Sequence, residues 1–360
     1  MTTLLSANAL QQQSIPWDDD SLYQQIAAYG YRHIDWTEVP DLWLLYLYLH
    51  DEPTLGAKRK QSTLKEYFRD ITHFFDFIHS QHASVTTIQQ EEIAHYQMEL
   101  QKQYKPMTIK RKTAVIKSFL TFLYRNNIIA KDLTIGLKQV AIKKEELVNR
   151  DLYEEEVDQL LTYFANQDYF MYTLLYTLVS TGLRIQELAK AKWAGMYYQP
   201  EVNMVFLTVV GKRNKIREVP IFEEVLEVLK EFRARRGFTS ELEDDGTAFF
   251  PKPNGKSYHF KYLSNEFTNQ IESLEHIFPF IKRRKDMERE MEQEGNPIKY
   301  KITPHTCRHY TASYYMERGA DMKAIQDLLD HESSLTTDTY LRRTRKFKEH
   351  AAVKIGRKFR

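Results

Sequence analysis

The chain has 360 residues, of which 42% are hydrophobic and 28% charged, with a formal net charge of +2. This composition is ordinary for a globular protein, and the length allows two or three domains. A single cysteine excludes an internal disulfide and is typical of a reducing compartment. The longest apolar run, residues 42–49, is far shorter than the roughly 20 residues that span a bilayer. No secretion signal is recognisable, so we expect a cytoplasmic protein without a membrane partner.

The small net charge hides an uneven distribution. Residues 1–57 carry eight acidic side chains against one arginine, Arg32. Residues 101–118 have six basic side chains and no acid, and residues 342–360 have nine against one glutamate. Segregated positive charge favours a polyanionic partner. A solvated helix face plus a basic tail would give the same pattern, so charge alone leaves the partner open.

In chain order, the first part of the sequence predicts a folded segment and then a helical bundle. Residues 1–57 are acidic but too rich in aromatic side chains to be disordered, and their role stays open. Apolar residues at helical spacing predict helices over 62–81, 91–103 and 107–127. We therefore predict a helical bundle over 58–142 and a polar linker over 143–152. The last of these helices carries the basic residues Lys110, Arg111, Lys112 and Lys117.

Beyond the linker, the pattern predicts a second, mainly helical domain with one small antiparallel sheet, over 153–345. Helices are expected at 153–167, 169–180 and, after a Thr-Gly break, 183–193. Two β-rich segments, 203–210 and 217–221, flank a turn and predict a hairpin. Later helices are expected at 222–237, at the highly charged stretch 281–297, and from Thr303-Pro304 to Gly319. Residues 346–360 form a basic tail.

The stretch HTCRH, residues 305–309, concentrates groups that could bind either a metal or a phosphate. His305 and His309 share one helical face, with Cys307 and His331 as further donors. The pattern lacks the glutamate of the H-E-x-x-H zinc motif, and Arg308 within it would repel a dication. We therefore predict no metal here, and we expect Cys307 to be a small core residue.

Cations elsewhere in the chain favour the phosphate interpretation. Arg308 lies three residues after His305, Arg184 begins a predicted helix after the Thr-Gly break, and Lys212 lies at the hairpin tip. Arginines can fork onto phosphate oxygens, while lysine and histidine can move protons and a tyrosine can attack. Such a set suffices for phosphoryl transfer through a covalent phosphotyrosine. The sequence has no glycine-rich nucleotide motif, and we expect no cofactor.

The segments TGLRIQEL, VGKRNKIREVP and ITPHTCRHYTASYYMERGADMKAIQDLLDHESSLTTDTY together resemble the tyrosine recombinases, the family of phage integrases and Xer-type resolvases. The likeness covers about residues 60–345. It implies a two-domain, C-shaped clamp on double-stranded DNA, with 58–142 as the SAM-like core-binding domain and 153–345 as the catalytic domain. It also implies a homotetramer on two paired recombination sites, in which the tail 346–360 docks on a neighbouring subunit.

The resemblance assigns the chemistry to particular residues. Tyr340 would attack the scissile phosphodiester, leaving a 3′-phosphotyrosyl bond and a free 5′-hydroxyl. Arg184 and Arg308 would neutralise the non-bridging oxygens, an electrostatic effect that usually dominates such catalysis. Glu187, one turn after Arg184, would orient that arginine; a surface helix acid is the alternative. Strand exchange through a Holliday junction would follow without metal or ATP, because each joining step reverses a cleavage.

Proton transfer is assigned in the same way. Lys212 would donate the proton to the leaving 5′-oxygen, and Lys215 competes with it for this role. His305 would act as a base toward Tyr340 or orient it. His331, nine residues before Tyr340, would hydrogen-bond the phosphate.

Three features depart from the family pattern. Arg213 stands where the family often has glycine, and the charged helix near 281–294 looks like an insertion relative to shorter members. Asp330 replaces the usual glycine before His331, where a helix ends in a left-handed geometry that aspartate tolerates less well. Other tyrosines also lie near the H-x-x-R motif, but their spacing suits packing on the helix. These are Tyr310, Tyr314 and Tyr315.

The sequence thus predicts a site-specific DNA recombinase for integration, excision or dimer resolution. Lys110, Arg111, Lys112 and Lys117 are expected to contact DNA, mainly its phosphates. Two alternatives are a type IB topoisomerase-like DNA relaxer and a non-catalytic DNA-binding factor. The target site, and whether the protein serves a chromosome, a phage or a transposon, stay open.

Overall fold

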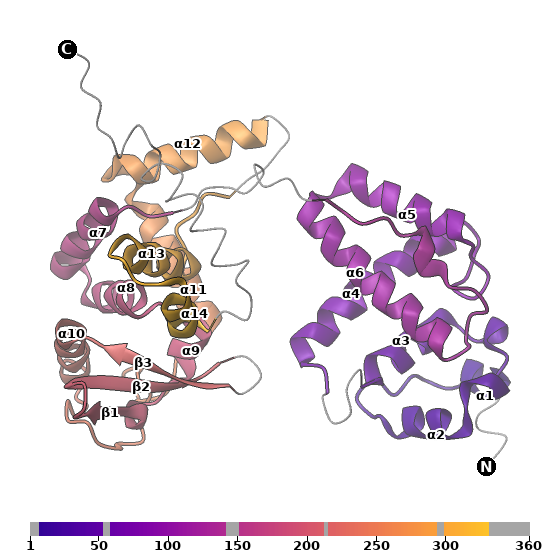
Figure 1. Ribbon diagram of the computed structural model, residues 1–360, viewed down its shortest axis with the longest axis horizontal. Coiled ribbons are helices and arrows are strands. Elements are labelled where there is room, and N and C mark those ends of the chain that lie inside the picture. The colour runs from indigo at the N-terminus through magenta and orange to yellow at the C-terminus, as the bar shows by residue number, and fades with distance from the viewer. Residues whose placement is uncertain (1–6, 53–57, 142–150, 212–214, 294–298, 331–360) are drawn as a thin grey trace. The chain divides into compact units, whose positions relative to one another are not determined.

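The computed structural model describes residues 7–52, 58–141, 151–211, 215–293 and 299–330 (Figure 1). The chain divides into two compact units, Met1–Leu147 and Val148–Arg360, and each has a large hydrophobic core of its own. The described part is mainly helical with one small antiparallel sheet, which confirms the predicted fold class.

The first unit is built from helices. The three helices predicted after residue 58 are present, each within one or two residues of the expected bounds. The helices are α1 (Ala7–Gln12), α2 (Ser21–Tyr29), α3 (Asp41–His50), α4 (Gln61–Ser80), α5 (Gln90–Gln103) and α6 (Pro106–Arg125). Helix α6 begins with Pro106 at its first turn, where the missing N–H costs no hydrogen bond.

The acidic N-terminal segment belongs to the core of this unit. Helix α3 is almost wholly buried, and its side chains join one apolar cluster with those of α4, α5 and α6. The ring of Tyr48 in α3 stacks on Tyr67 of α4, and its hydroxyl donates to Ser118 of α6 at 2.8 Å. The change of composition near residue 57 therefore does not mark a boundary between two cores.

The second unit combines helices with a three-stranded sheet of order β1-β2-β3. Its helices are α7 (Glu154–Gln167), α8 (Tyr169–Thr181), α9 (Ile185–Lys190), α10 (Glu223–Ala234), α11 (Phe260–Glu272), α12 (Pro279–Gln293), α13 (Pro304–Glu317) and α14 (Met322–Leu329). Its strands are β1 (Met196–Gln199), β2 (Met204–Val210) and β3 (Ile216–Ile221). The predicted hairpin is confirmed as β2–β3, in antiparallel register from Val205 opposite Ile221 to Val210 opposite Ile216. Strand β1 and helix α11 had not been predicted.

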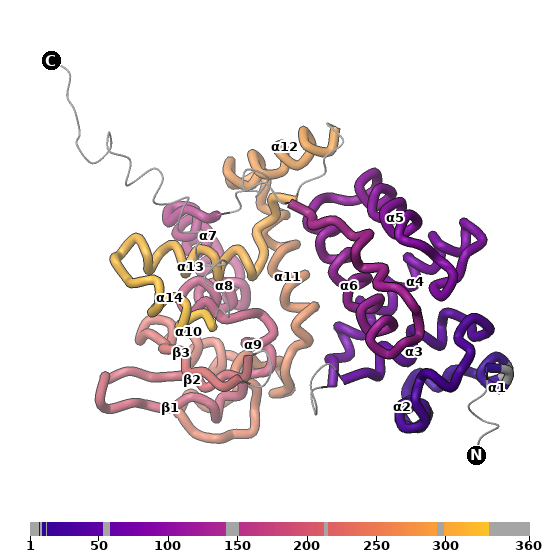
Figure 2. The backbone as a smooth tube through the Cα atoms, turned by 45° about the vertical axis from the view of Figure 1, so that its right-hand side comes forward, coloured from indigo at the N-terminus to yellow at the C-terminus, as the bar shows by residue number. Residues whose placement is uncertain are grey.

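Helix α8 is the centre of the second unit. It packs on α7, α10 and α13, and Figure 2 shows α13 beside it, with α14 following α13. Its apolar side chains, such as Leu174 and Leu178, are fully buried. The helix ends at Gly182, whose left-handed φ of 61° confirms the predicted break. In the part of the chain that the structure describes, no helix is both long and apolar enough to cross a membrane.

Candidate functional site

Three arginines from different elements converge on the C-terminal end of α14. Each donates a hydrogen bond to one of three consecutive backbone carbonyls. The pairs are Arg217 Nη1 with Leu328, Arg308 Nη2 with Leu329, and Arg184 Nη2 with Asp330. The last carbonyls of a helix lack partners within the helix and carry the negative end of its dipole. Guanidinium groups therefore satisfy this helix end and hold it in place.

Arg184 is positioned by the sharp turn between α8 and α9. It is the N-cap residue of α9 and follows Gly182 and the fully buried Leu183. Its Nη1 donates to Glu187 Oε1 at 2.7 Å, and its side chain is 34% exposed. The guanidinium is thus fixed from one side and open to a ligand on the other.

Glu187 is a buried carboxylate that joins two of the arginines. Only 4% of the residue is exposed, so the surface-acid alternative is wrong. Its Oε2 accepts the Arg184 backbone N–H at 2.9 Å and Arg217 Nη2 at 2.7 Å. Burial alone would raise the pKa of Glu187, but Arg217 and Arg184 hold it below its usual value. The carboxylate is therefore charged and orders both arginines.

Arg308 lies on α13, which starts at the predicted place with Thr303 as N-cap and Pro304 in its first turn. The side chain is buried, and its Nη1 donates to Gly182 O at 2.7 Å. Burial together with the charges of Arg184 and Arg217 lowers the pKa of Arg308 to about 9. Burying this charge costs free energy, and a bound anion would offset that cost.

Asp330 is the second carboxylate of the cluster. It ends α14 in the expected left-handed geometry, with φ 50° and ψ 53°. Its Oδ1 accepts a hydrogen bond from Lys215 Nζ at 2.7 Å, and its Oδ2 lies 3.5 Å from Arg184 Nη1. Burial would raise the pKa of Asp330, but Lys215 and the arginines lower it. The sequence had marked Asp330 only as a departure from the family pattern and had missed these contacts.

The stem of the β2–β3 hairpin adjoins both carboxylates. The Gly211 N–H donates to Lys215 O at 2.7 Å and closes the stem. A Cβ atom on Gly211 would lie 3.1 Å from Asp330 Oδ2 and 3.6 Å from Glu187 Oε1. A side chain at position 211 would crowd the Asp330 carboxylate, which would have to shift by a few tenths of an ångström. Among the described residues, this cluster brings four cations to two carboxylates, a surplus of positive charge suited to a phosphate.

Three of the predicted catalytic residues, Lys212, His331 and Tyr340, lie outside the described residues. In the chain, Lys212 directly follows Gly211 and His331 directly follows Asp330. Both neighbours belong to the cluster, so the residues directly before Lys212 and His331 lie at this site.

The histidines and the cysteine of HTCRH occupy different surroundings. His305 is exposed, and its ring packs edge-on against His309 with 4.4 Å between centroids. Cys307 is fully buried, as predicted, and burial raises the pKa of its thiol. No group of three or more potential metal ligands gathers within the described ranges of the chain.

The neighbouring tyrosines pack on α13 and its surroundings, as their spacing predicts. Tyr310 is buried, which raises the pKa of its hydroxyl, and its ring lies 5.7 Å from that of Tyr314. The Tyr315 hydroxyl donates to Ser180 O at 3.5 Å. A tyrosine held in this way is a poor nucleophile, because deprotonation is disfavoured.

The predicted basic face of α6 is narrower than the sequence suggested. Lys110 and Lys117 are exposed, and Arg111 is partly exposed. Lys112 is only 5% exposed, because its ammonium lies 3.2 Å from Asp70 Oδ1, which also binds Arg111. The prediction that Lys112 belongs to an exposed DNA-binding face is therefore wrong. Its position three residues after the core residue Ile109 turns it inward.

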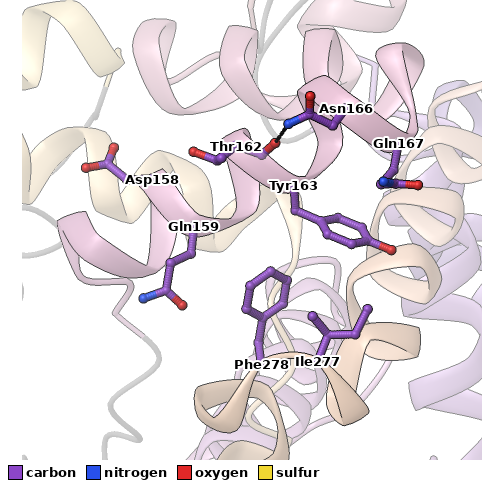
Figure 3. A pocket seen from close by; sticks show the side chains of 8 residues that line it. All are labelled: Asp158, Gln159, Thr162, Tyr163, Asn166, Gln167, Ile277 and Phe278. Carbon is purple, nitrogen blue, oxygen red and sulfur yellow. Dashed lines mark hydrogen bonds between the residues drawn. The ribbon is translucent and has the colours of Figure 1, made fainter.

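A surface pocket of about 510 Å³ has a lining unlike that of the arginine cluster (Figure 3). It is lined by residues of α7, from Asp158 to Gln167, and by Ile277 and Phe278. The Tyr163 ring packs edge-on against Phe278, with 5.7 Å between centroids. The pocket offers no cation, so a phosphate would not be held there.

The arginine cluster is suited to a phosphate group, and comparison with known proteins identifies the family to which the chain belongs. Residues 150–346 match the phage integrase family, and residues 54–127 match the phage integrase N-terminal SAM-like domain. The chain therefore belongs to the phage integrase family.

Relatives of known name span most of the chain. It is 28% identical over 286 residues to tyrosine recombinase XerD of Halalkalibacterium halodurans, covering 78% of this chain and 86% of the relative. It is 26% identical over 333 residues to tyrosine recombinase XerC of Rickettsia bellii, covering 88% and 97%.

Solved structures share the fold. The XerH site-specific recombinase bound to palindromic difH substrate, in a post-cleavage complex, matches with a TM-score of 0.61 and 16% identity, over 97% of this chain and 93% of that one. A lambda integrase tetramer bound to a Holliday junction matches with a TM-score of 0.59 and 16% identity, over 84% and 77%.

Proposed function

We propose that the protein is a site-specific DNA recombinase of the tyrosine type, which cuts and rejoins two paired sites on double-stranded DNA. The observation that carries this proposal is the convergence of Arg184 and Arg308 on the end of α14, directly before His331. Two arginines from distant parts of the chain share this helix end with the stem of the hairpin that continues into Lys212. Family membership and the names of the relatives support the same activity.

The chemistry follows from the charges of the cluster. The Tyr340 oxygen bonds to phosphorus, the bond from phosphorus to the 5′-oxygen breaks, and a 3′-phosphotyrosyl intermediate results. The transition state carries more negative charge than the phosphodiester, and the preorganised arginines stabilise that difference. His305 either accepts the proton of Tyr340 or orients that side chain, and the hairpin lysine protonates the leaving oxygen. Because Lys215 is paired with Asp330, Lys212 is the preferred donor.

In this proposal both units of the chain bind DNA. Residues 58–142 act as the core-binding domain, on which the N-terminal segment packs, and residues 153–345 as the catalytic domain. The exposed Lys110 and Lys117 and the partly exposed Arg111 contact phosphates, whereas the buried Lys112 does not. Four copies assemble on two sites, with a Holliday junction between the two strand exchanges and the tail 346–360 docked on a neighbour. The protein acts in the cytoplasm, at the nucleoid.

The first test is covalent capture. The protein is incubated with nicked duplexes that carry DNA flanking its own gene, without added metal or ATP, and SDS-resistant protein–DNA adducts are measured. We expect an adduct with the wild type and with Tyr262→Phe, a matched control on an exposed tyrosine of α11. Tyr340→Phe should bind the same DNA and form none.

Three results would contradict the proposal. An adduct with Tyr340→Phe would mean that another residue is the nucleophile. Binding by the wild type with no adduct on any nicked duplex would favour a DNA-binding factor. Relaxation of supercoiled DNA without recombinant product would favour the topoisomerase-like alternative.

A further inference from the structure

We propose that Asp330 is a positioning residue of this site. Its carboxylate fixes the stem of the β2–β3 hairpin, so that the preferred proton donor of that hairpin, Lys212, meets the leaving 5′-oxygen. The inference rests on the proposed function. It concerns a residue at which this chain departs from the glycine usual in the family.

Both the backbone conformation and the burial of Asp330 are energetically unfavourable. A left-handed backbone is unfavourable for a residue with a Cβ atom, and its φ is 50°. Only 6% of its side chain is exposed, and burying a carboxylate requires compensation. Glycine would avoid both penalties. Strain and a buried charge at one position beside catalytic residues motivate a functional role.

The contacts of the carboxylate show what this role is. Oδ1 binds Lys215 Nζ at 2.7 Å, and Lys215 directly precedes strand β3. Oδ2 faces Gly211, the residue after β2, where a Cβ would come within 3.1 Å. The carboxylate therefore binds one side of the hairpin stem and lies close to the other. The Asp330 backbone carbonyl meanwhile accepts Arg184 Nη2 at 2.9 Å.

The two buried carboxylates thus serve different cations. Glu187 holds Arg184 and Arg217, which both donate to backbone carbonyls at the end of α14. Asp330 holds the stem of the hairpin that carries the proton donor. Since the Lys215 side chain is 67% exposed and that of Asp330 is 6% exposed, the anion lies beneath the cation and leaves its outer side accessible to DNA.

A sulfur substitution separates this role from the others. During cleavage the bond from Tyr340 to phosphorus forms, the bond to the 5′-oxygen breaks, and that oxygen takes a proton from the hairpin lysine. If sulfur replaces the 5′-oxygen, the leaving thiolate is stable without a proton, because leaving groups of lower pKa depart faster. A defect in proton donation is therefore rescued by sulfur, whereas a defect in the arginines or the tyrosine is not.

The experiment compares Asp330→Asn and Asp330→Gly with the wild type on matched nicked duplexes with a 5′-bridging oxygen or sulfur. Asn tolerates the left-handed geometry and removes the charge, while glycine also removes the strain and guards against misfolding. We expect adduct formation on the oxygen substrate to slow by about 10- to 100-fold in both variants, as when a supporting partner of a reactive group is lost. The Kd for DNA should change less than threefold, and the sulfur substrate should restore a rate near that of the wild type.

Asp327→Asn is the matched control. Asp327 lies on the same helix and also pairs with a lysine, Lys323, at 2.8 Å, but it is exposed, so its rate should equal that of the wild type. Wild-type cleavage of the oxygen substrate by Asp330→Gly, or a defect that persists on the sulfur substrate, would overturn the inference. Absence of an adduct with the wild type on both substrates would instead refute the proposed function, and the inference with it.

Discussion

Glu187 and Arg217 form an ion pair of 2.7 Å in the interior of the second unit, with 4% and 7% of their side chains exposed. The sequence had assigned no role to Arg217. The same carboxylate accepts both the backbone N–H and a guanidinium N–H of Arg184. Arg217 in turn donates to Leu328 O. One buried pair thus links strand β3, the start of α9 and the end of α14.

Replacing Glu187 by Gln should therefore impair both stability and activity. The amide keeps the shape but leaves the buried Arg217 without its directly paired carboxylate, which costs about 3–5 kcal/mol of the free energy of unfolding. Misplacement of Arg184 should slow adduct formation by about 100-fold. Urea unfolding and single-turnover cleavage measure the two effects. Glu227→Gln, at an exposed acid of α10, should change neither, and equal behaviour of the two variants would contradict this account.

Gly182→Ala tests the turn that presents Arg184. The left-handed φ of 61° costs a residue with a Cβ about 1–2 kcal/mol. The new methyl would also lie 2.6 Å from Leu329 Cδ2, and the Gly182 carbonyl is an acceptor for Arg308. Gly237→Ala is the matched control, because Gly237 is also left-handed but has no atom within 4 Å of a Cβ. Both variants should lose stability in urea, and only Gly182→Ala should lose more than the strain alone and cleave DNA more slowly.

Replacing Lys110 or Lys112, two lysines of α6, by alanine should have different effects on DNA binding and stability. Lys110→Ala should leave the free energy of unfolding within about 0.5 kcal/mol and reduce the salt dependence of DNA binding by about one unit of slope. Lys112→Ala should destabilise the protein by about 1–3 kcal/mol, since Asp70 then loses its buried cation and keeps Arg111 and the more distant, largely exposed Arg69. Fluorescence anisotropy against salt concentration and urea unfolding measure both. A reduced salt slope for Lys112→Ala without lost stability would restore it as a DNA contact.

The buried Asp70 should make part of the stability depend on pH. Burial would raise its pKa, but Arg111 and Lys112 hold the pKa below 3.8. A carboxyl group whose pKa is lower in the folded state stabilises the protein above the unfolded pKa, and this contribution disappears as pH falls through the folded pKa. The stability difference between the wild type and Asp70→Asn should thus be full at pH 7 and shrink below about pH 4. Urea midpoints over this range test it, and a difference that grows on acidification would contradict it.

Local signals in the sequence predicted most of the helices, whereas the candidate site residues came from the family resemblance. The periodicity of α4 and α6, the Thr303-Pro304 start and the Thr-Gly break each depend on residues close in the chain. The contact between Lys215 and Asp330 joins residues 115 positions apart, and no local pattern specifies it. Strand β1 has only four residues, too few for a clear alternation. Helix α11 did carry a signal, in the buried Leu263, Phe267 and Ile271 at spacings of four.

The carbonyls that receive the three arginines belong to the backbone, which every amino acid shares. An exchange of the half-buried Leu328 for another helix-forming residue therefore leaves all three acceptors in place. Adding or deleting one residue within α14 is different, because it would turn the acceptors by about 100° around the helix axis. This part of the site tolerates drift in side-chain identity but not in length, and variants with a one-residue insertion should be rare among active proteins of any mutant library.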